Sequence, residues 1–444
     1  MAPMNGAPAG NTGFLERYFR LAENNTTIRR EMLGGLTTFM TMAYIIVVNP
    51  EMLAQTGMPP EGVLFATCVS AAIATLVMGL WANYPLALAP GMSLNAYFTY
   101  SVCLGMHVPW QTALGAVFIS GALFLVLTVS RIREQIVNGI PNSLKHSTVV
   151  GIGLFIAFVG LRSAKIVVAN PATFVGLGNF SDHEVQIACF GLLLTLILMA
   201  RKVSGAILLG IFGTTLVAIV FKLAHWPAAL VSIPHPGATV LKLDIRGALH
   251  LGLFEIIFAF LFVDLFDNVG TLVGVCEQAG LVKDGKIPRV GRVLMADAAG
   301  TVVGSLTGTS TITSYIESAA GVAAGARTGL SSVLVAALFL VAMFFSPIAT
   351  AIPQFATAPA LILVGALMTQ SVMQVDWTDF TEAFPAFVVI LAMPLTFSIA
   401  TGLSFGVICY TIVKAATGKF RDISVVVWAL TILFILRYVY LAAA

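Results

Sequence analysis

Charged residues are scarce in this sequence. A chain of 444 residues holds 23 basic and 20 acidic side chains, which is 10% of the total, whereas ordinary soluble domains carry about 25%. A soluble protein of this length could not cover its surface with so few charges. The net charge of +3 is also too small and too scattered to predict nucleic-acid binding.

Cysteine clusters and nucleotide-binding motifs are missing as well. The five cysteines stand singly in or beside apolar runs, with no CxxC pair and no Cys/His cluster. The sequence therefore indicates no disulfide framework, no metal site and no cofactor. The phosphate-binding motif GxxxxGK[ST] is absent, which argues against an ATP-driven pump. Residues 1–31 lack the apolar core of a cleavable signal, so the first apolar run is expected to stay in the membrane.

Long apolar runs are what the sequence has instead. Hydrophobic residues make up 58% of the chain and the mean hydropathy is +0.96. Because about 20 apolar residues cross the ~30 Å hydrocarbon core as a helix, the runs predict an all-α polytopic membrane protein with about fourteen spans. The predicted spans are 32–50, 63–82, 86–104, 110–129, 145–164, 185–200, 204–222, 248–273, 289–307, 309–324, 328–346, 358–375, 383–399 and 400–416. A last apolar stretch, 423–441, is either a fifteenth span or an interfacial helix.

The basic residues predict the orientation. Those of the N-terminal segment and those that follow spans 4, 6, 8 and 14 fall on one side, which should be the cytoplasm of a cell-membrane protein. The segment after the first span carries Glu51 and Glu61 and no basic residue, as an outer loop should. The exceptions to this pattern are Arg162, Lys165, Lys242 and Arg246.

The two halves of the chain resemble each other. The run Ala122–Val126 recurs as Ala337–Val341, and Ser93–Tyr97 is similar to Thr311–Tyr315, at offsets close to half the chain. If each half holds seven spans, an odd number, the second half must be inverted relative to the first. Inverted repeats are typical of secondary transporters, with the substrate site at the repeat interface.

Two spans look broken. Gly308–Glu317 is rich in Thr and β-branched residues, which form helices poorly, and small residues follow it. We expect an extended segment in span 10 and then a half-helix beginning near Glu317, with Ile316 and Ser318 beside it as further candidate substrate-binding residues. The counterpart in span 3 is the segment that contains Leu94 and Asn95. Such breaks offer backbone N–H and C=O groups to a polar ligand.

Acidic residues remain within the predicted spans of the second half. An Asp at the bilayer centre costs about 2.5–3.5 kcal/mol, so each needs a reason. At 100° per residue, Asp264, Asp267, Asn268 and Thr271 share one helix face, whereas Glu255 points away. A structural, hydrogen-bonded role is the alternative, mainly for Glu255 and Asp264. The candidate proton carriers are Asp267, Glu317, Asp264 and Asp297.

Several motifs carry a resemblance to a known family. They are Glu23–Thr27, Gly35–Tyr44, Ala89–Phe98, Phe262–Leu272, Ser314–Val322 and Arg327–Gly329. In this order, between about residues 14 and 420, the chain resembles the nucleobase–ascorbate transporter (nucleobase:cation symporter) family, and specifically its azaguanine-resistance branch of purine permeases. The resemblance implies two inverted seven-span repeats, in which a core domain (spans 1–4 and 8–11) moves against a gate domain (spans 5–7 and 12–14).

The resemblance also implies a binding site. Asp267 and Glu317 would bind the base, span 1 would contribute near Thr38, and span 3 would contribute backbone near Leu94 and Asn95. This sequence has Asp267 where uracil and xanthine members carry Glu, and Thr38 where pyrimidine members carry His. Both smaller side chains leave more room, as a bicyclic purine requires.

The resulting hypothesis is a purine-base:proton symporter of the adenine/guanine/hypoxanthine type, with an elevator-like or rocking motion. A homodimer is left open. The expected segments are 1–31 (cytoplasmic), 32–130 and 247–346 (core), 131–246 and 347–422 (gate) and 423–444 (C-terminal hydrophobic segment). An anion transporter of the same architecture is the first alternative, although Glu317 would repel an anion. A membrane-embedded enzyme would need a nucleophile or metal group beside its carboxylates, and a channel would need polarity along whole spans.

Overall fold

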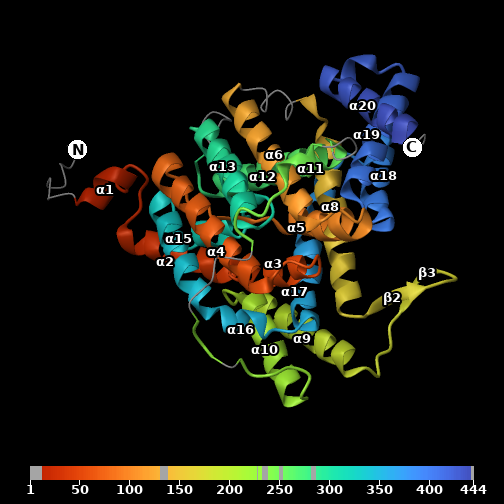
Figure 1. Ribbon diagram of the computed structural model, residues 1–444. Helices are drawn as coiled ribbons and strands as arrows, with labels where there is room; N and C mark the ends of the chain where they lie inside the picture. The colour runs from red at the N-terminus through yellow and green to blue at the C-terminus, as the bar shows by residue number, and fades with distance from the viewer. Residues whose placement is uncertain are drawn as a thin grey trace, which may run out of the picture.

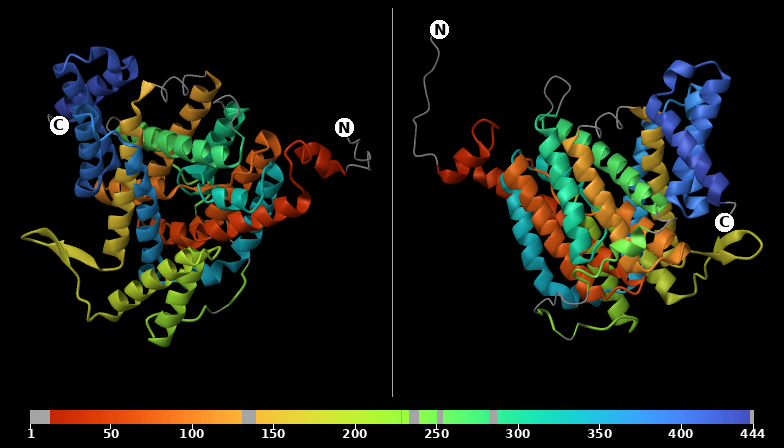
Figure 2. Two further views of the ribbon diagram at one scale, coloured as in Figure 1. Left: turned by 180° about the vertical axis from the view of Figure 1, so that it is seen from behind. Right: turned by 45° about the horizontal axis from the view of Figure 1, so that its top comes forward.

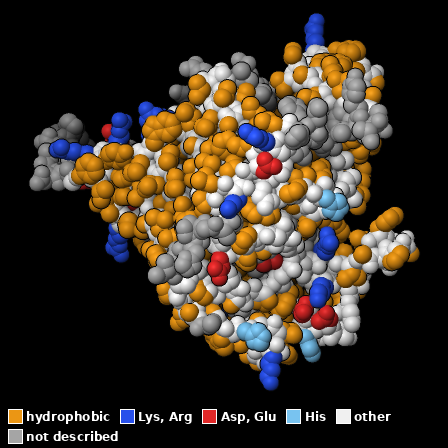
Figure 3. All heavy atoms as spheres, in the orientation of Figure 1, with side chains coloured by type: hydrophobic (Ala, Val, Ile, Leu, Met, Phe, Trp, Pro, Cys, Tyr) orange, Lys and Arg blue, Asp and Glu red, His pale blue; other side chains and the backbone are white. Residues whose placement is uncertain are grey.

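The computed structural model describes residues 13–130, 139–227, 229–232, 239–249, 254–281 and 287–441. Helices dominate this part of the chain, and two short two-stranded sheets interrupt them (Figure 1). Hydrophobic side chains cover much of the face in Figure 3, and charged ones are few and scattered. This surface is the one expected of a protein whose helices face lipid.

The first half of the chain runs from α1 to α11. Its elements are α1 Phe14–Phe19, α2 Ile28–Met42, α3 Ile45–Ala54, α4 Pro60–Val77, a π-helical turn Met78–Ala82, β1 Leu88–Pro90, α5 Met92–Ala96, a π-helical stretch Tyr97–Gly105, α6 Trp110–Val129, α8 Asn142–Ser163, β2 Val167–Asn170, β3 Phe174–Leu177, α9 His183–Ala200, α10 Ala206–Val220 and α11 Ile245–Ala248.

The second half runs from α12 to α20. Its elements are α12 Phe254–Gln278, α13 Val290–Thr307, β4 Ile312–Ser314, α14 Ser318–Ala323, α15 Gly329–Ala342, a 3₁₀ turn Met343–Phe345, α16 Ser346–Thr350, α17 Gln354–Met368, a 3₁₀ turn Thr369–Gln374, α18 Phe380–Thr396, α19 Ile399–Ala416, a 3₁₀ turn Phe420–Asp422 and α20 Val425–Leu441.

Each predicted span coincides with a helix or a broken helix in the described residues. Eight of these helices are long and apolar enough to cross a membrane unaided, and shorter apolar helices such as α10 and α18 fill other predicted spans. The first span begins at Ile28, four residues before the predicted start, because Thr27 caps the helix by accepting a hydrogen bond from the Arg30 backbone N–H. The stretch 423–441 contains one helix, α20, which packs on α19.

The two predicted breaks meet in the buried interior. Strand β1 pairs with β4 in antiparallel register, so that Leu88 faces Ser314 and Pro90 faces Ile312. A half-helix follows each strand: α5 after β1 and α14 after β4. The sequence match of Ser93–Tyr97 with Thr311–Tyr315 is therefore not a structural equivalence, because the first segment is helical and the second contains β4.

The long helices pack in two groups. One contains α2, α4, α6, α13 and α15, and the other contains α8, α9, α10, α17, α18 and α19. Glycines allow the closest crossings: a Cβ at Gly365 of α17 would lie 2.3 Å from the Gly153 carbonyl oxygen of α8, and one at Gly329 would lie 2.0 Å from the Gly79 carbonyl oxygen. Small residues at crossings are how membrane helices gain van der Waals contact in lipid.

Candidate functional site

The paired strands β1 and β4, called the β1–β4 crossing from here on, are held in place by hydrogen bonds from neighbouring helices. The Thr75 hydroxyl of α4 donates to the Leu88 carbonyl at 2.9 Å, and the Thr301 hydroxyl of α13 donates to the Ile312 carbonyl at 3.0 Å. Tyr315 links the strands directly, because its phenol donates to the Pro90 carbonyl at 2.5 Å. Backbone N–H and C=O groups that leave helical geometry inside a membrane need hydrogen-bond partners from the protein, and side chains of α4 and α13 supply some of them here.

Leu94 and Asn95 lie in α5, immediately after β1, as predicted. Both side chains are fully buried. The Asn95 Oδ1 atom accepts a hydrogen bond from the Ser310 hydroxyl, and within the described residues the Asn95 Nδ2 atom is buried with no partner. A buried donor without a partner costs about 1–3 kcal/mol, so this amide is a candidate hydrogen-bond donor to a ligand.

Glu317 lies at the start of α14, also as predicted. Its side chain is half-buried, and its Oε1 atom accepts a hydrogen bond of 2.7 Å from the Tyr44 phenol. Tyr44 is itself buried, at the short break between α2 and α3. The Thr41 hydroxyl of α2 donates to the Glu317 carbonyl oxygen at 3.5 Å. The first span therefore positions both the side chain and the backbone of this glutamate.

The two neighbours of Glu317 differ. The Ile316 side chain is 62% exposed, whereas the Ser318 side chain is buried and its hydroxyl accepts a hydrogen bond of 3.0 Å from the Ala87 backbone N–H. Ser318 thus joins α14 to the segment that leads into β1. Ile316 is the member of the predicted site with the more accessible side chain.

Thr38 lies against the same half-helix. It is buried on α2, and a Cβ atom at Gly321 of α14 would come within 2.0 Å of its hydroxyl oxygen. The structure therefore brings Thr38 to α14, as the predicted site requires. It also shows that Gly321 is needed for this contact.

Helix α12 carries the predicted acidic face. Asp264 and Asn268 are fully buried and Thr271 is 7% exposed, as a polar face turned toward protein requires. Within the described residues the Asn268 amide is buried with no partner. Asp267 and Glu255 belong to α12, but their side chains lie outside the described residues.

Asp297 lies on α13, the helix that packs against β4. Glu317, in contrast, lies at the start of the half-helix α14. Asp297 is fully buried. It is one turn before Thr301, which donates to β4, and before Gly300, where a Cβ would lie 3.0 Å from the Ile312 Cγ2 atom. Asp297 therefore occupies the helix face that supports β4.

Sequence reasoning missed Glu31, Tyr44 and Ser310. Glu31 is fully buried on α2, and its carboxylate accepts hydrogen bonds from the backbone N–H groups of Arg327, Thr328 and Ser331 at 2.8–3.3 Å. A carboxylate at a helix N-terminus is favourable, so Glu31 ties α2 to the start of α15. In the sequence Glu31 follows Arg29 and Arg30, so it resembles a solvent-exposed charged residue at the start of a helix. Only its burial in the structure shows that it is not one.

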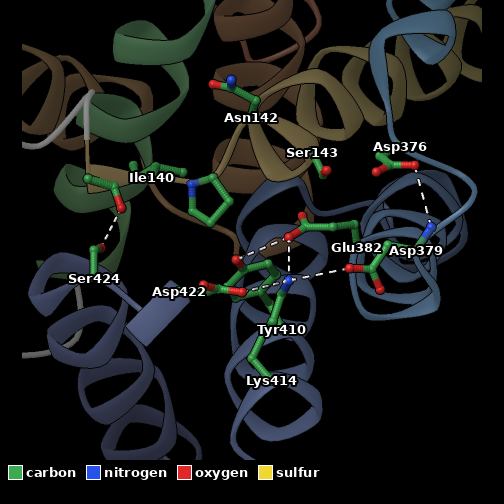
Figure 4. Close-up of a pocket in the computed structure, with 12 residues that line it drawn as sticks. Ile140, Asn142, Ser143, Asp376, Asp379, Glu382, Tyr410, Lys414, Asp422 and Ser424 are labelled. Carbon is green, nitrogen blue, oxygen red and sulfur yellow. Dashed lines mark hydrogen bonds and ion pairs between the residues drawn. The ribbon is translucent and has the colours of Figure 1, made fainter. Parts of the chain in front are cut away.

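A cavity lies away from this crossing, where α8, α18 and the end of α19 meet (Figure 4). Its volume is about 540 Å³. Lys414 is almost completely buried there, and its ammonium contacts Glu382 at 2.7 Å, Asp422 at 3.5 Å and Asp379 at 3.9 Å. The hydrogen bonds from Lys419 and Thr381 hold the pKa of Asp379 well below its usual range. This cluster was not predicted, because its members are spread over about 45 residues of sequence.

The arrangement at the β1–β4 crossing suits hydrogen bonding and proton transfer. It combines a carboxylate from Glu317, the Asn95 amide and the buried polar face of α12 with the first turn of α5, whose backbone N–H groups lack intrahelical acceptors. In the part of the chain that the structure describes, no three His, Cys, Asp or Glu side chains are grouped to hold a metal ion.

Comparisons of the sequence identify relatives over almost the whole chain. The model of the family described as "Permease family" matches residues 29–405. Putative permease MJ0326 of Methanocaldococcus jannaschii is 56% identical, over 97% of this chain and 99% of the relative. Guanine/hypoxanthine permease PbuO of Bacillus subtilis is 46% identical (94% and 99% covered), and adenine permease AdeP of Escherichia coli is 43% identical (100% of both).

Comparisons of the structure find the same fold in solved transporters. The transmembrane domain of the cyanobacterial bicarbonate transporter BicA matches with a TM-score of 0.65, at 16% identity, over 84% of this chain and 97% of that one. SLC26A9 matches with a TM-score of 0.63, at 13% identity, over 87% and 65%. At these identities the likeness shows the all-α polytopic fold and leaves the substrate open.

Proposed function

Because this chain belongs to the permease family, and so is a multi-pass membrane transporter rather than an enzyme, we propose that it imports purine nucleobases of the adenine, guanine and hypoxanthine type. Relatives at 43–46% identity that span nearly the whole chain are named as guanine/hypoxanthine and adenine permeases. The proposed location is the cell membrane with a cytoplasmic N-terminus, as the basic residues indicate.

The observation that carries the proposal is the placement of Glu317. Its carboxylate stands where α14 begins, beside the β1–β4 crossing, and Tyr44 fixes one of its oxygens at 2.7 Å. A purine presents N–H donors and ring-nitrogen or carbonyl acceptors on one flat edge. A carboxylate accepts from such donors, and the Asn95 amide, buried without a partner among the described residues, can serve the acceptors.

The transport step is proposed to be a movement of the core against the gate, elevator-like or rocking. The core would comprise 32–130 and 247–346, and the gate 131–246 and 347–422. The separate packing of the α2–α15 and α8–α19 groups supports this division. The site residues Thr38, Asn95 and Glu317 all lie in core segments, so a bound base would travel with the core.

Proton symport is proposed as the energy source. Glu317, Asp264, Asp267 and Asp297 are the candidate carriers, since carboxylates held inside a membrane protein mark proton pathways. Glu317 is proposed both to accept hydrogen bonds from the base and to take up a proton, so binding and protonation would be coupled at one side chain. The Tyr44 phenol can donate to Oε1 in either protonation state.

The matching fold of bicarbonate and SLC26-type transporters keeps an anion substrate as the alternative. Such a substrate would meet the carboxylate of Glu317 and the acidic face of α12. Because like charges repel strongly where water is excluded, this site favours a neutral ligand.

An uptake assay tests the function. Cells or proteoliposomes that contain the protein should accumulate labelled hypoxanthine, with competition by adenine or guanine and none by sulfate. Uptake should fall as external pH rises and collapse with a protonophore. Uptake that survives the protonophore and requires Na⁺ would contradict proton coupling, and sulfate or bicarbonate uptake in place of purine uptake would favour the anion alternative.

Tyr44→Phe tests whether the phenol positions Glu317. Losing this hydrogen bond removes one restraint on the orientation of the carboxylate, so purine affinity should fall roughly three- to tenfold, about 0.7–1.4 kcal/mol, with little change in thermal stability. The control is Tyr438→Phe, which removes a 2.6 Å phenol–hydroxyl contact between α20 and Ser404 of α19, helices that supply no residue of the proposed site. Equal affinity in Tyr44→Phe and the unmodified protein would show that the phenol has no role in binding.

A further inference from the structure

A hairpin between α8 and α9 stands away from the helical body. Strands β2 and β3 pair in antiparallel register, with Val167 opposite Leu177 and Asn170 opposite Phe174. In Figures 1 and 2 the hairpin projects sideways from the end of α8 instead of continuing along the helix axis. An isolated two-stranded hairpin is at best marginally stable in water, so a surface of this kind needs a partner.

The hairpin is apolar and uncharged. From residue 166 to residue 181 the sequence contains no Asp, Glu, Lys, Arg or His. The side chains of Phe174, Val175 and Leu177 are 86%, 46% and 75% exposed, and Val168 is 38% exposed. Figure 3 shows hydrophobic side chains at the tip of this arm.

The turn presents Phe174 outward at a cost in backbone strain. The Asn170 side chain accepts hydrogen bonds from the backbone N–H groups of Ala172 and Thr173, which tightens the turn. Phe174 then adopts φ = 63°, a left-handed conformation that an aromatic residue rarely takes. Backbone strain of this kind points to a function at the strained residue.

Charged residues mark the base of the hairpin. The Lys165 ammonium and the Glu184 carboxylate form an ion pair of 2.7 Å that joins the end of α8 to the start of α9. Asp182 caps α9 by accepting from the Glu184 backbone N–H. Charges at both helix ends place the base on the aqueous side of the headgroup region, and the uncharged arm leaves this base sideways.

We propose that the β2–β3 hairpin lies in the headgroup region of the lipid bilayer and anchors the helices α8 and α9 at a fixed depth. Helix α9, which follows the arm, also has exposed apolar side chains that would face lipid: Leu193 is 60% and Ile197 is 53% exposed. Because the arm has no charged side chain, contact with lipid suits it better than contact with water. Its strand edges have unpaired backbone groups, which cannot enter the hydrocarbon core but can meet water among the headgroups.

A spin label at the tip tests this directly. Ala172→Cys is labelled in a chain whose Cys189 and Cys409 are replaced by Ala, since the other three cysteines are buried. The protein is placed in nanodiscs of phosphatidylethanolamine and phosphatidylglycerol. Collisions with oxygen, which concentrates in lipid, are compared with collisions with a water-soluble nickel chelate. Labels at Leu193 and at Ser181, which is exposed beside the ion pair, give the lipid and water references.

We expect the Ala172 label to give an oxygen-to-nickel collision ratio between the two references and at least threefold above that of Ser181. In the added variant Phe174→Ser/Leu177→Ser the ratio should fall to the Ser181 value. A ratio equal to that of Ser181 in the starting chain would overturn the proposal. A second result would also overturn it: neither reagent reaches the label, and spin–spin broadening disappears when the labelled protein is diluted with unlabelled protein. The hairpin would then lie against a second copy of the chain.

Discussion

Replacing Glu317 with glutamine should weaken purine binding by roughly 10- to 150-fold. The change keeps the size of the side chain but removes its charge and turns one acceptor oxygen into a donor nitrogen. A buried hydrogen bond to a charged group contributes about 1.5–3 kcal/mol, which corresponds to that range of affinity. The Tyr44 phenol that holds Oε1 at 2.7 Å can still donate to the amide oxygen, so the local fold should survive.

Calorimetric titration of the purified protein with its preferred base measures the effect. Glu61→Gln is the matched control, because Glu61 is an exposed residue in the first turn of α4, and it should bind normally. Asp267→Asn should impair transport yet leave more residual binding than Glu317→Gln, since Asp264 and Asn268 share its helix. Full affinity in Glu317→Gln would remove this residue from the site.

Replacing Lys414 with methionine should destabilise the folded protein by about 2–4 kcal/mol. Loss of one partner from a fully buried ion pair costs about 3–5 kcal/mol, and we expect less here because Asp422 is half-exposed and can be hydrated. Depression of the pKa of Asp379 means that its contribution to stability is present at neutral pH and is lost only as the pH falls through the lowered value. At pH 7 Asp379 therefore stays charged, and it loses its contact with the Lys414 ammonium in the variant.

The midpoint of thermal unfolding in detergent measures this loss. Lys419→Met is the control, because Lys419 also contacts Asp379, at 2.8 Å, but is 42% exposed, and exposed pairs contribute about 0–1 kcal/mol. Adding Glu382→Met to Lys414→Met should recover much of the stability, since it removes the acid nearest to the missing ammonium. An unchanged midpoint in the single variant would show that the cluster does not stabilise these helices.

The local sequence was sufficient to locate the breaks in spans 3 and 10. Thr-rich and Gly/Pro-containing segments form helices poorly, and the structure has β1 and β4 at those places. Helix periodicity likewise predicted the buried face with Asp264 and Asn268. These features depend on neighbours a few residues apart, which a single sequence displays.

Contacts between distant segments could not be predicted in the same way. Tyr44 and Glu317 are 273 residues apart, and nothing in the run Thr41–Tyr44 marks a helix break, since it contains neither Gly nor Pro. Glu31 resembles a surface acid until three backbone N–H groups from the start of α15 surround it. The sequence similarity between Ser93–Tyr97 and Thr311–Tyr315 likewise did not predict structural equivalence, because the first segment is helical and the second contains β4.

The β1–β4 ladder also sets an order of events during synthesis. Leu88 emerges from the ribosome 226 residues before its partner Ser314 (314 − 88), and at about 5–20 residues per second that interval is roughly 10–45 s. Thr75 of the first half can already bond the Leu88 backbone. The other β1 backbone groups that pair with β4 would be unpaired in a bilayer during this time, which costs several kcal/mol for each group. The first half must therefore keep this segment shielded by the translocation machinery or by water until the second half arrives, so the nascent chain cannot complete its assembly one repeat at a time.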